Sequence, residues 1–148
     1  MTFLLEHLIL MTLVVLSLSA NIEDCGSKNG IVRNVSVSGC SASDTRCRLP
    51  RGTAVNITVE FESEVDSRSV TAQAYGTAFG VPLPLRVKHE DVCRNDISCP
   101  IKDGETYIDR NAINIPSLAP RIRTNVVYEL RDQMQNRIVC VEIPSVFI

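Results

Sequence analysis

Residues 55–62 read Val-Asn-Ile-Thr-Val-Glu-Phe-Glu, and apolar and polar side chains alternate along the whole stretch. Val55, Ile57, Val59 and Phe61 fall on one face of an extended chain, and polar residues occupy the other. A period of two is typical of a β-strand that buries one face and exposes the other. The stretch therefore predicts a strand whose apolar face contributes to a core.

The same period recurs, less regularly, in further stretches of the chain. We expect strands at residues 31–38, 69–78, 124–131 and 137–143, the last ending at Pro144. Clusters of Gly, Pro, Asn and Asp separate these runs and predict turns. No segment has convincing helical spacing, and many short strands at such intervals favour an all-β sandwich or barrel.

The first twenty residues differ from the rest of the chain. Residues 8–18 are almost entirely aliphatic, and Ser17, Ser19 and Ala20 supply small side chains. This predicts a secretory signal peptide at residues 1–20, cleaved after Ser19 or Ala20, and a mature domain at residues 21–148. The start of the chain has no Lys or Arg, which leaves a retained membrane anchor as the alternative.

All six cysteines follow the predicted leader, and an even number in an exported chain indicates disulfides. Cys40 lies close to Cys47 in the sequence, and Cys93 lies close to Cys99, so each pair can close a tight turn. Cys25 is then left to pair with Cys140. Zinc binding is not expected, because the chain has no Cys-x-x-Cys motif and only one histidine, His89, after the leader.

Charge and motif content exclude several classes of function. The formal net charge is −2 without a basic stripe, which argues against a nucleic-acid partner. His89 lies in a charged stretch and no nucleophile motif accompanies it, so we expect no enzyme activity, no cofactor and no metal site. Two Asn-x-Ser/Thr motifs predict glycosylation at Asn34 and Asn56.

Large rings are scarce in the mature chain. It has no Trp, and its aromatic residues are Phe61, Phe79, Phe147, Tyr75, Tyr107 and Tyr128. Two facing sheets lie about 10 Å apart, and side chains or a ligand must fill the space between them. Branched aliphatic residues can fill such a core, but the scarcity of rings is also compatible with a cavity.

Several motifs, mostly in the second half of the chain, resemble those of one known family. They are Gly80-Val81, Pro84, Asp91-Val92-Cys93, Cys99-Pro100-Ile101, Gly104, Tyr107, Val126-Val127-Tyr128-Glu129-Leu130 with Asp132, and Cys140-Val141-Glu142-Ile143-Pro144. Together with the six cysteines they resemble the ML (lipid-recognition) domain family, and within it the Niemann-Pick type C2-like branch, which has arthropod members. The resemblance covers nearly the whole of residues 21–148.

The resemblance implies an immunoglobulin-like β-sandwich of about seven strands, with three disulfides and an apolar cavity between the sheets. It implies a monomeric carrier, either secreted or in the endosome–lysosome lumen, that binds a sterol, fatty acid or other apolar lipid. The carrier would transfer its lipid to membranes or to a membrane lipid-transfer partner. One alternative is an innate-immune or chemosensory module that recognises lipopolysaccharide or a lipophilic semiochemical. Another is a disulfide-rich structural or inhibitor protein with a filled core.

The lipid-binding residues are expected from the strand pattern and from the resemblance. Alternation directs six side chains inward, and the resemblance places Leu85, Ile115 and Ala119 at the mouth of the pocket. The full set of predicted lipid contacts is Val55, Ile57, Val59, Leu85, Tyr107, Ile113, Ile115, Ala119, Val126 and Tyr128. Plain core packing is the alternative for each of them.

The chain departs from the family pattern around this mouth. Leu85 replaces a common Phe, Ala119 replaces a Tyr that precedes proline, and Tyr128 replaces a Trp. Because these substitutions remove ring volume, we expect an entrance wider than that of the sterol carrier. Arg86 and Lys88 replace prolines beside the mouth, and they could attract anionic lipid head groups.

Overall fold

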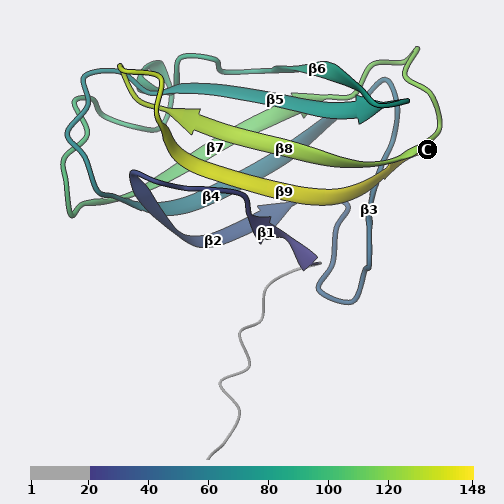
Figure 1. Ribbon diagram of the computed structural model, residues 1–148, viewed down its shortest axis with the longest axis horizontal. Coiled ribbons are helices and arrows are strands. Elements are labelled where there is room, and N and C mark those ends of the chain that lie inside the picture. Colours follow the sequence, from purple (N-terminus) through teal and green to yellow (C-terminus); the bar gives the residue numbers. More distant parts are fainter. Residues whose placement is uncertain (1–20) are drawn as a thin grey trace, which may run out of the picture.

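The computed structural model describes residues 21–148, and the predicted leader lies outside the described residues (Figure 1). The described chain forms nine strands and one short 3₁₀ helix, η2 (Val92–Arg94). The strands are β1 (Glu23–Asp24), β2 (Gly30–Val37), β3 (Cys47–Leu49), β4 (Ala54–Ser63), β5 (Thr71–Ala78), β6 (Val81–Val87), β7 (Thr106–Asn114), β8 (Arg123–Arg131) and β9 (Arg137–Phe147).

These strands form two facing layers. One layer runs β9-β8-β5-β6, with β1 and β3 on the outer edge of β9, and the other runs β7-β4-β2. β6 belongs to both, because it pairs with β5 along most of its length and with β7 at its end (Figure 1). Apart from the short β1 and β3, seven strands of 7 to 11 residues build the sandwich. The predicted all-β sandwich is confirmed.

Prolines account for two differences from the sequence-based expectation. The expected end of the last strand at Pro144 is wrong, because β9 continues to Phe147. Pro144 lies between the part of β9 that pairs with β1 and the part that pairs with β3, where neither edge strand needs its missing N–H. β6 contains Pro82 and Pro84, and over residues 81–85 its pairs are all with β5, an edge position that tolerates proline.

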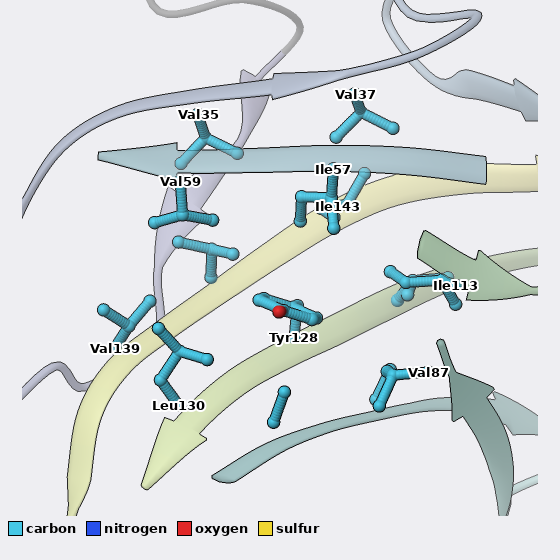
Figure 2. Close-up of a cluster of buried hydrophobic side chains, with 14 of the residues drawn as sticks. Val35, Val37, Ile57, Val59, Val87, Ile113, Tyr128, Leu130, Val139 and Ile143 are labelled. Atoms are coloured by element: carbon cyan, nitrogen blue, oxygen red, sulfur yellow. The ribbon is translucent and has the colours of Figure 1, made fainter. Parts of the chain in front are cut away.

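The core consists of the inward residues of both layers. Along β4, β7, β8 and β9 the inward positions alternate with outward ones and are buried, except the partly exposed Tyr107 on β7, as expected for strands that face a core. Figure 2 shows Val59 and Ile57 of β4 facing Leu130 of β8 and Ile143 of β9. The aliphatic side chains of the two layers therefore meet along the length of the sandwich.

At the other edge of the sandwich, β2 and β9 approach each other closely without pairing as neighbouring strands. The Asn29 amide donates to the Arg137 carbonyl at 3.0 Å. At Gly30, a β-carbon would lie 2.5 Å from the Ile138 carbonyl oxygen and 2.9 Å from its Cγ2 atom, so only glycine lets the two strands approach this closely. This edge fixes one layer against the other.

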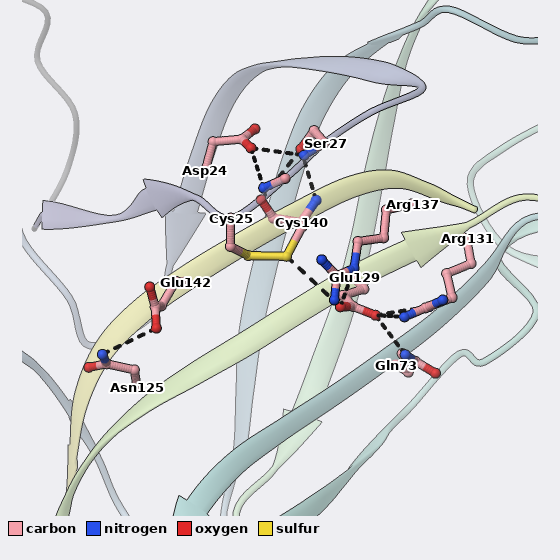
Figure 3. The surroundings of a disulfide bond; sticks show 11 residues. Asp24, Cys25, Ser27, Gln73, Asn125, Glu129, Arg131, Arg137, Cys140 and Glu142 are labelled. Carbon is pink, nitrogen blue, oxygen red and sulfur yellow. Dashed lines mark hydrogen bonds and ion pairs between the residues drawn. A yellow bond between two sulfur atoms is a disulfide. The ribbon is translucent and has the colours of Figure 1, made fainter. Parts of the chain in front are cut away.

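Three disulfides reinforce the sandwich. Cys25–Cys140, Cys40–Cys47 and Cys93–Cys99 are the pairs that sequence spacing favours. Beside the first of them, Glu129 is fully buried on the outer face of β8 (Figure 3). Its carboxylate pairs with Arg131 at 2.8 Å and with Arg137 at 2.9 Å. A buried charge with two cationic partners is compensated, so this cluster has a structural role.

Candidate functional site

The structure brings the predicted lipid contacts together between the layers. Nine of the ten are buried, with at most 5% of the side chain exposed: Val55, Ile57, Val59, Leu85, Ile113, Ile115, Ala119, Val126 and Tyr128. They come from β4, β6, β7, β8 and the segment after β7, and most belong to one continuous apolar interior (Figure 2). The interior is closed to solvent in this conformation, and the role of these residues as lipid contacts stays a prediction.

Tyr107 differs from the other nine because it is only partly buried. Its ring lies beside Phe61, its partner across β4 and β7, with the ring centroids 5.8 Å apart. Its hydroxyl accepts a hydrogen bond from the Lys102 amide at 2.8 Å. Tyr107 thus caps one end of the interior and has its polar tip already paired.

At the predicted mouth the two layers are joined by few strand pairs. β6 and β7 share only two residue pairs, Arg86 with Asn114 and Val87 with Ile113, whereas β4 and β7 pair from Ala54 to Glu62. Leu85 precedes the short junction on β6, and Ile115 and Ala119 follow it after β7. The three mouth residues therefore surround a seam that has few strand hydrogen bonds.

The loop before β4 contacts the two mouth residues that follow β7. The Gly52 amide donates to the Ile115 carbonyl at 2.7 Å, and the Ile115 amide donates to the Thr53 carbonyl at 2.9 Å. The Arg51 guanidinium donates to the Ala119 carbonyl at 3.1 Å. These hydrogen bonds extend the pairing of β4 with β7 and tie Ile115 and Ala119 to the loop before β4.

A polar cluster crosses the apolar interior from one layer to the other. The Tyr128 hydroxyl on β8 donates to Asp109 Oδ2 on β7 at 2.5 Å and accepts from Asn111 Nδ2 at 3.1 Å. Asn111 also binds the His89 backbone, accepting from its amide at 2.9 Å and donating to its carbonyl at 2.7 Å. Tyr128 is thereby a directional link between the two sheets.

The sequence-based site did not include Asp109 or Asn111. A signal for both existed, because Tyr107, Asp109, Asn111 and Ile113 occupy alternate positions of one strand and must share a face. Searching for apolar alternation alone passes over polar residues at inward positions.

Comparison with known proteins places the chain in a family. The sequence profile of the ML domain matches residues 19–147. The chain belongs to the ML domain family.

Two related proteins match this ML domain over most of their length. The bovine NPC intracellular cholesterol transporter 2 is 34% identical over 122 residues, which cover 82% of this chain and 80% of the transporter. The crystal structure of a Niemann-Pick type C2 protein from the Japanese carpenter ant superposes with a TM-score of 0.77 and 25% identity. That match covers 86% of this chain and 98% of the ant protein.

A third likeness concerns the fold alone. Chicken MD-1, in a structure complexed with lipid IVa, superposes on this ML domain with a TM-score of 0.54 at 14% identity. The match covers 83% of this chain and 85% of MD-1. The sandwich architecture is thus shared with a protein whose structure contains a bound lipid.

Burial controls the protonation of the polar cluster in this ML domain. Loss of hydration raises the pKa of Asp109 to about 6, an effect that the hydrogen bond from Tyr128 opposes and the charge of Asp96 increases. Burial and the neighbouring carboxylate also raise the pKa of Tyr128 well above its ordinary value. Tyr128 is therefore neutral and donates, while Asp109 is largely ionised at neutral pH.

The grooves formed by the described residues lie on the outer surface of the sandwich. One has a volume of about 820 Å³ and is lined largely by polar residues, including Arg46, Arg123 and Glu142. No three His, Cys, Asp or Glu residues within residues 21–148 are placed to hold a metal ion. Across the same residues, no helix is long and apolar enough to cross a membrane.

The two glycosylation motifs and the basic pair occupy outward positions. Asn34 on β2 and Asn56 on β4 are exposed, so neither side chain is prevented from carrying a glycan, and glycosylation stays a prediction. Arg86 and Lys88 are exposed and alternate with the buried Leu85 and Val87. The two cations therefore flank the predicted mouth on its outer side.

Proposed function

We propose that this ML domain is a carrier that encloses a sterol or another apolar lipid between its two sheets. The observation that carries the proposal is the continuous buried apolar interior, in a chain 34% identical to a cholesterol transporter. We assign it no catalytic step: its work is to bind and release the lipid.

The interior supplies the affinity. A sterol-sized ligand hides roughly 400 Å² of apolar surface, worth about 10 kcal/mol at about 25 cal/mol per Å². Part of this free energy compensates for the contacts that the two layers lose when they separate to admit the lipid. Aliphatic contacts have no preferred direction. Core side chains can therefore exchange their contacts with each other for contacts with the lipid.

The weak seam between β6 and β7 is the expected entrance. Only two residue pairs join these strands, and a few loop hydrogen bonds cover Ile115 and Ala119. The opposite edge, between β2 and β9, is held by the close approach at Gly30. We expect the ligand to enter at this seam, beside the predicted mouth residues Leu85, Ile115 and Ala119.

Exposed apolar residues at one end of the sandwich suit contact with a membrane. Phe79 in the β5–β6 turn and Val81 at the start of β6 are 86% and 63% exposed, and Leu118 after β7 is 95% exposed. Figure 1 shows the β5–β6 turn and the β7–β8 loop at the same end of the molecule. Apolar tips that enter a bilayer would bring the seam to the lipid, and Arg86 and Lys88 would attract anionic head groups.

The proposal extends to the compartment and the assembly. Three disulfides suit the oxidising lumen of the secretory pathway or the extracellular space. Delivery outside the cell and delivery in the endosome–lysosome lumen are both compatible with such a domain. We propose a monomer that meets its membrane or membrane partner transiently.

A lipid-transfer assay tests the proposal. The purified domain is mixed with phosphatidylcholine donor vesicles carrying labelled cholesterol, then with acceptor vesicles, and cholesterol is followed into the protein and into the acceptors. We expect stoichiometric loading and faster transfer than without protein. Loading without transfer would favour the recognition module, and no loading of any sterol or fatty acid would refute a lipid-binding role.

A further inference from the structure

The polar cluster at the centre of the sandwich contains one hydrogen-bonding atom without a partner. Asp109 is fully buried, and its Oδ1 atom has no hydrogen bond, whereas Oδ2 accepts from Tyr128. In the register of β4 and β7, Asp109 lies opposite Val59, whose side chain points into the interior (Figure 2). The unpartnered oxygen thus belongs to the same interior that the proposed lipid would enter.

The rest of the cluster is fully paired. Asn111 donates to His89 and Tyr128 and accepts from the amides of His89 and Ala112, which uses every hydrogen-bonding position of its amide. The Tyr128 hydroxyl both donates and accepts. What the cluster lacks is one donor, directed at Asp109 Oδ1.

We propose that Asp109 anchors the lipid, and that this domain selects lipids whose inserted end carries a hydroxyl group that donates to Oδ1. The proposal rests on the carrier function and specifies its ligand class. A hydroxyl supplies the single missing donor. A fatty-acid carboxylate inserted at this point would face the Asp109 carboxylate, and a lipid ammonium would bring several donors to one acceptor.

Tyr128 and Asn111 hold the anchor in position. In the closed sandwich the hydrogen bond from Tyr128 on the facing layer holds Asp109 Oδ2, so Oδ1 is the oxygen left for the ligand. Asn111 ties β7 to the backbone beyond β6 through His89, next to the seam where the lipid enters. The anchor therefore lies on the strand that borders the entrance.

Competitive loading with three sterols tests the anchor. The full domain is incubated with phosphatidylcholine vesicles that contain equal amounts of 5α-cholestane, cholesterol and 25-hydroxycholesterol. 5α-Cholestane carries no hydroxyl group, cholesterol carries one at its ring end, and 25-hydroxycholesterol carries one at each end. The bound sterols are then extracted and quantified, and the ratio of hydroxylated to plain sterol is compared between variants, so that the different solubilities of the free probes cancel.

Two variants remove the carboxylate. Asp109→Leu combined with Tyr128→Phe makes the pair apolar and leaves no buried charge unpaired, and Asp109→Asn preserves the shape without the charge. We expect the wild-type ratio, for at least one hydroxylated probe, to exceed that of the double variant by about tenfold or more, the usual worth of a hydrogen bond to a charged group. Asp109→Asn is expected between them.

Two further variants separate an anchor from a structural role. Tyr128→Phe alone keeps the carboxylate but removes the hydrogen bond that positions it, so the preference for hydroxylated sterol should fall between those of the wild type and the double variant. Asp103→Asn changes an exposed carboxylate outside the sandwich and should behave as the wild type. Equal ratios in the wild type and both Asp109 variants, with sterol still bound, would overturn the anchor and leave the carrier intact. A wild-type protein that retains none of the three probes would reject the carrier and the anchor together.

Discussion

The pH dependence of stability gives a direct measure of the buried carboxylate. Burial raises the pKa of Asp109 from 3.8 to about 6, so the folded state holds this proton more tightly than the unfolded chain does. Stability from this group is fully present below the unfolded value and is lost as the pH rises through about 6. Since one pKa unit is worth about 1.4 kcal/mol, the change amounts to about 3 kcal/mol.

Urea unfolding of the wild type and Asp109→Asn, with the disulfides intact, measures this contribution. Tyrosine fluorescence and far-ultraviolet circular dichroism report the transition, because the chain has no Trp. As the pH falls from about 7 to about 4, the free energy of unfolding of the wild type should rise relative to the variant by about 2 kcal/mol, most of the full change. Other carboxylates titrate in both proteins, so their effects cancel in the difference.

A companion variant gives the cause of the shift. The hydrogen bond from Tyr128 lowers the pKa of Asp109 and opposes the effect of burial. Tyr128→Phe should therefore move the titration of Asp109 to a higher pH. Parallel stability profiles for the wild type and Asp109→Asn between about pH 4 and about pH 7 would refute the assignment of Asp109 as a desolvated carboxylate.

Three further predictions concern the frame of the sandwich and its surface. Gly30→Ala should lower the free energy of unfolding by about 2 kcal/mol, because its β-carbon would lie 2.5 Å from a carbonyl oxygen of β9, whereas Gly76→Ala, with no contact closer than 3.4 Å, should change it little. Replacing both cysteines of the Cys25–Cys140 disulfide by serine should cost about 4–5 kcal/mol in chemical denaturation, because the bridge joins residues 115 apart in sequence; an unchanged midpoint would contradict this. Reversing Arg86 and Lys88 to Glu should weaken sedimentation with phosphatidylserine vesicles but not with phosphatidylcholine vesicles, and equal binding to both would reject a head-group role.

The fold follows from the sequence where side chains report directly on burial. The alternation at residues 55–62 identifies β4, because each apolar residue there faces the core and most of the polar ones face outward. β6 is harder to recognise, because Pro82 and Pro84 argue against a strand until its unpaired edge is known. Whether a segment with prolines forms a strand depends on its pairing with strands distant in the sequence. The local sequence carries no information on that pairing.

The candidate site follows from the sequence only in its apolar part. Val55, Ile57, Val59, Val126 and Tyr128 are inward residues as alternation requires. Asp109 is missed because a carboxylate is ordinarily assigned to solvent, and its burial depends on a hydroxyl that β8 contributes from the opposite layer. Complementarity between two polar groups on different sheets becomes visible only when the sheets are placed together.

Tyr128 stands where the family resemblance implies a Trp, and its hydroxyl and the burial of Asp109 explain each other. A buried tyrosine requires a partner for its hydroxyl, and Asp109 and Asn111 provide both an acceptor and a donor. A Trp at the same place has a single N–H donor and could not both donate to Asp109 and accept from Asn111. A Tyr in place of a Trp thus changes the chemistry of the interior as well as its volume. Apolar contacts between the layers can re-form around any apolar ligand. A carboxylate held by one oxygen distinguishes ligands that bring a hydrogen-bond donor from those that do not.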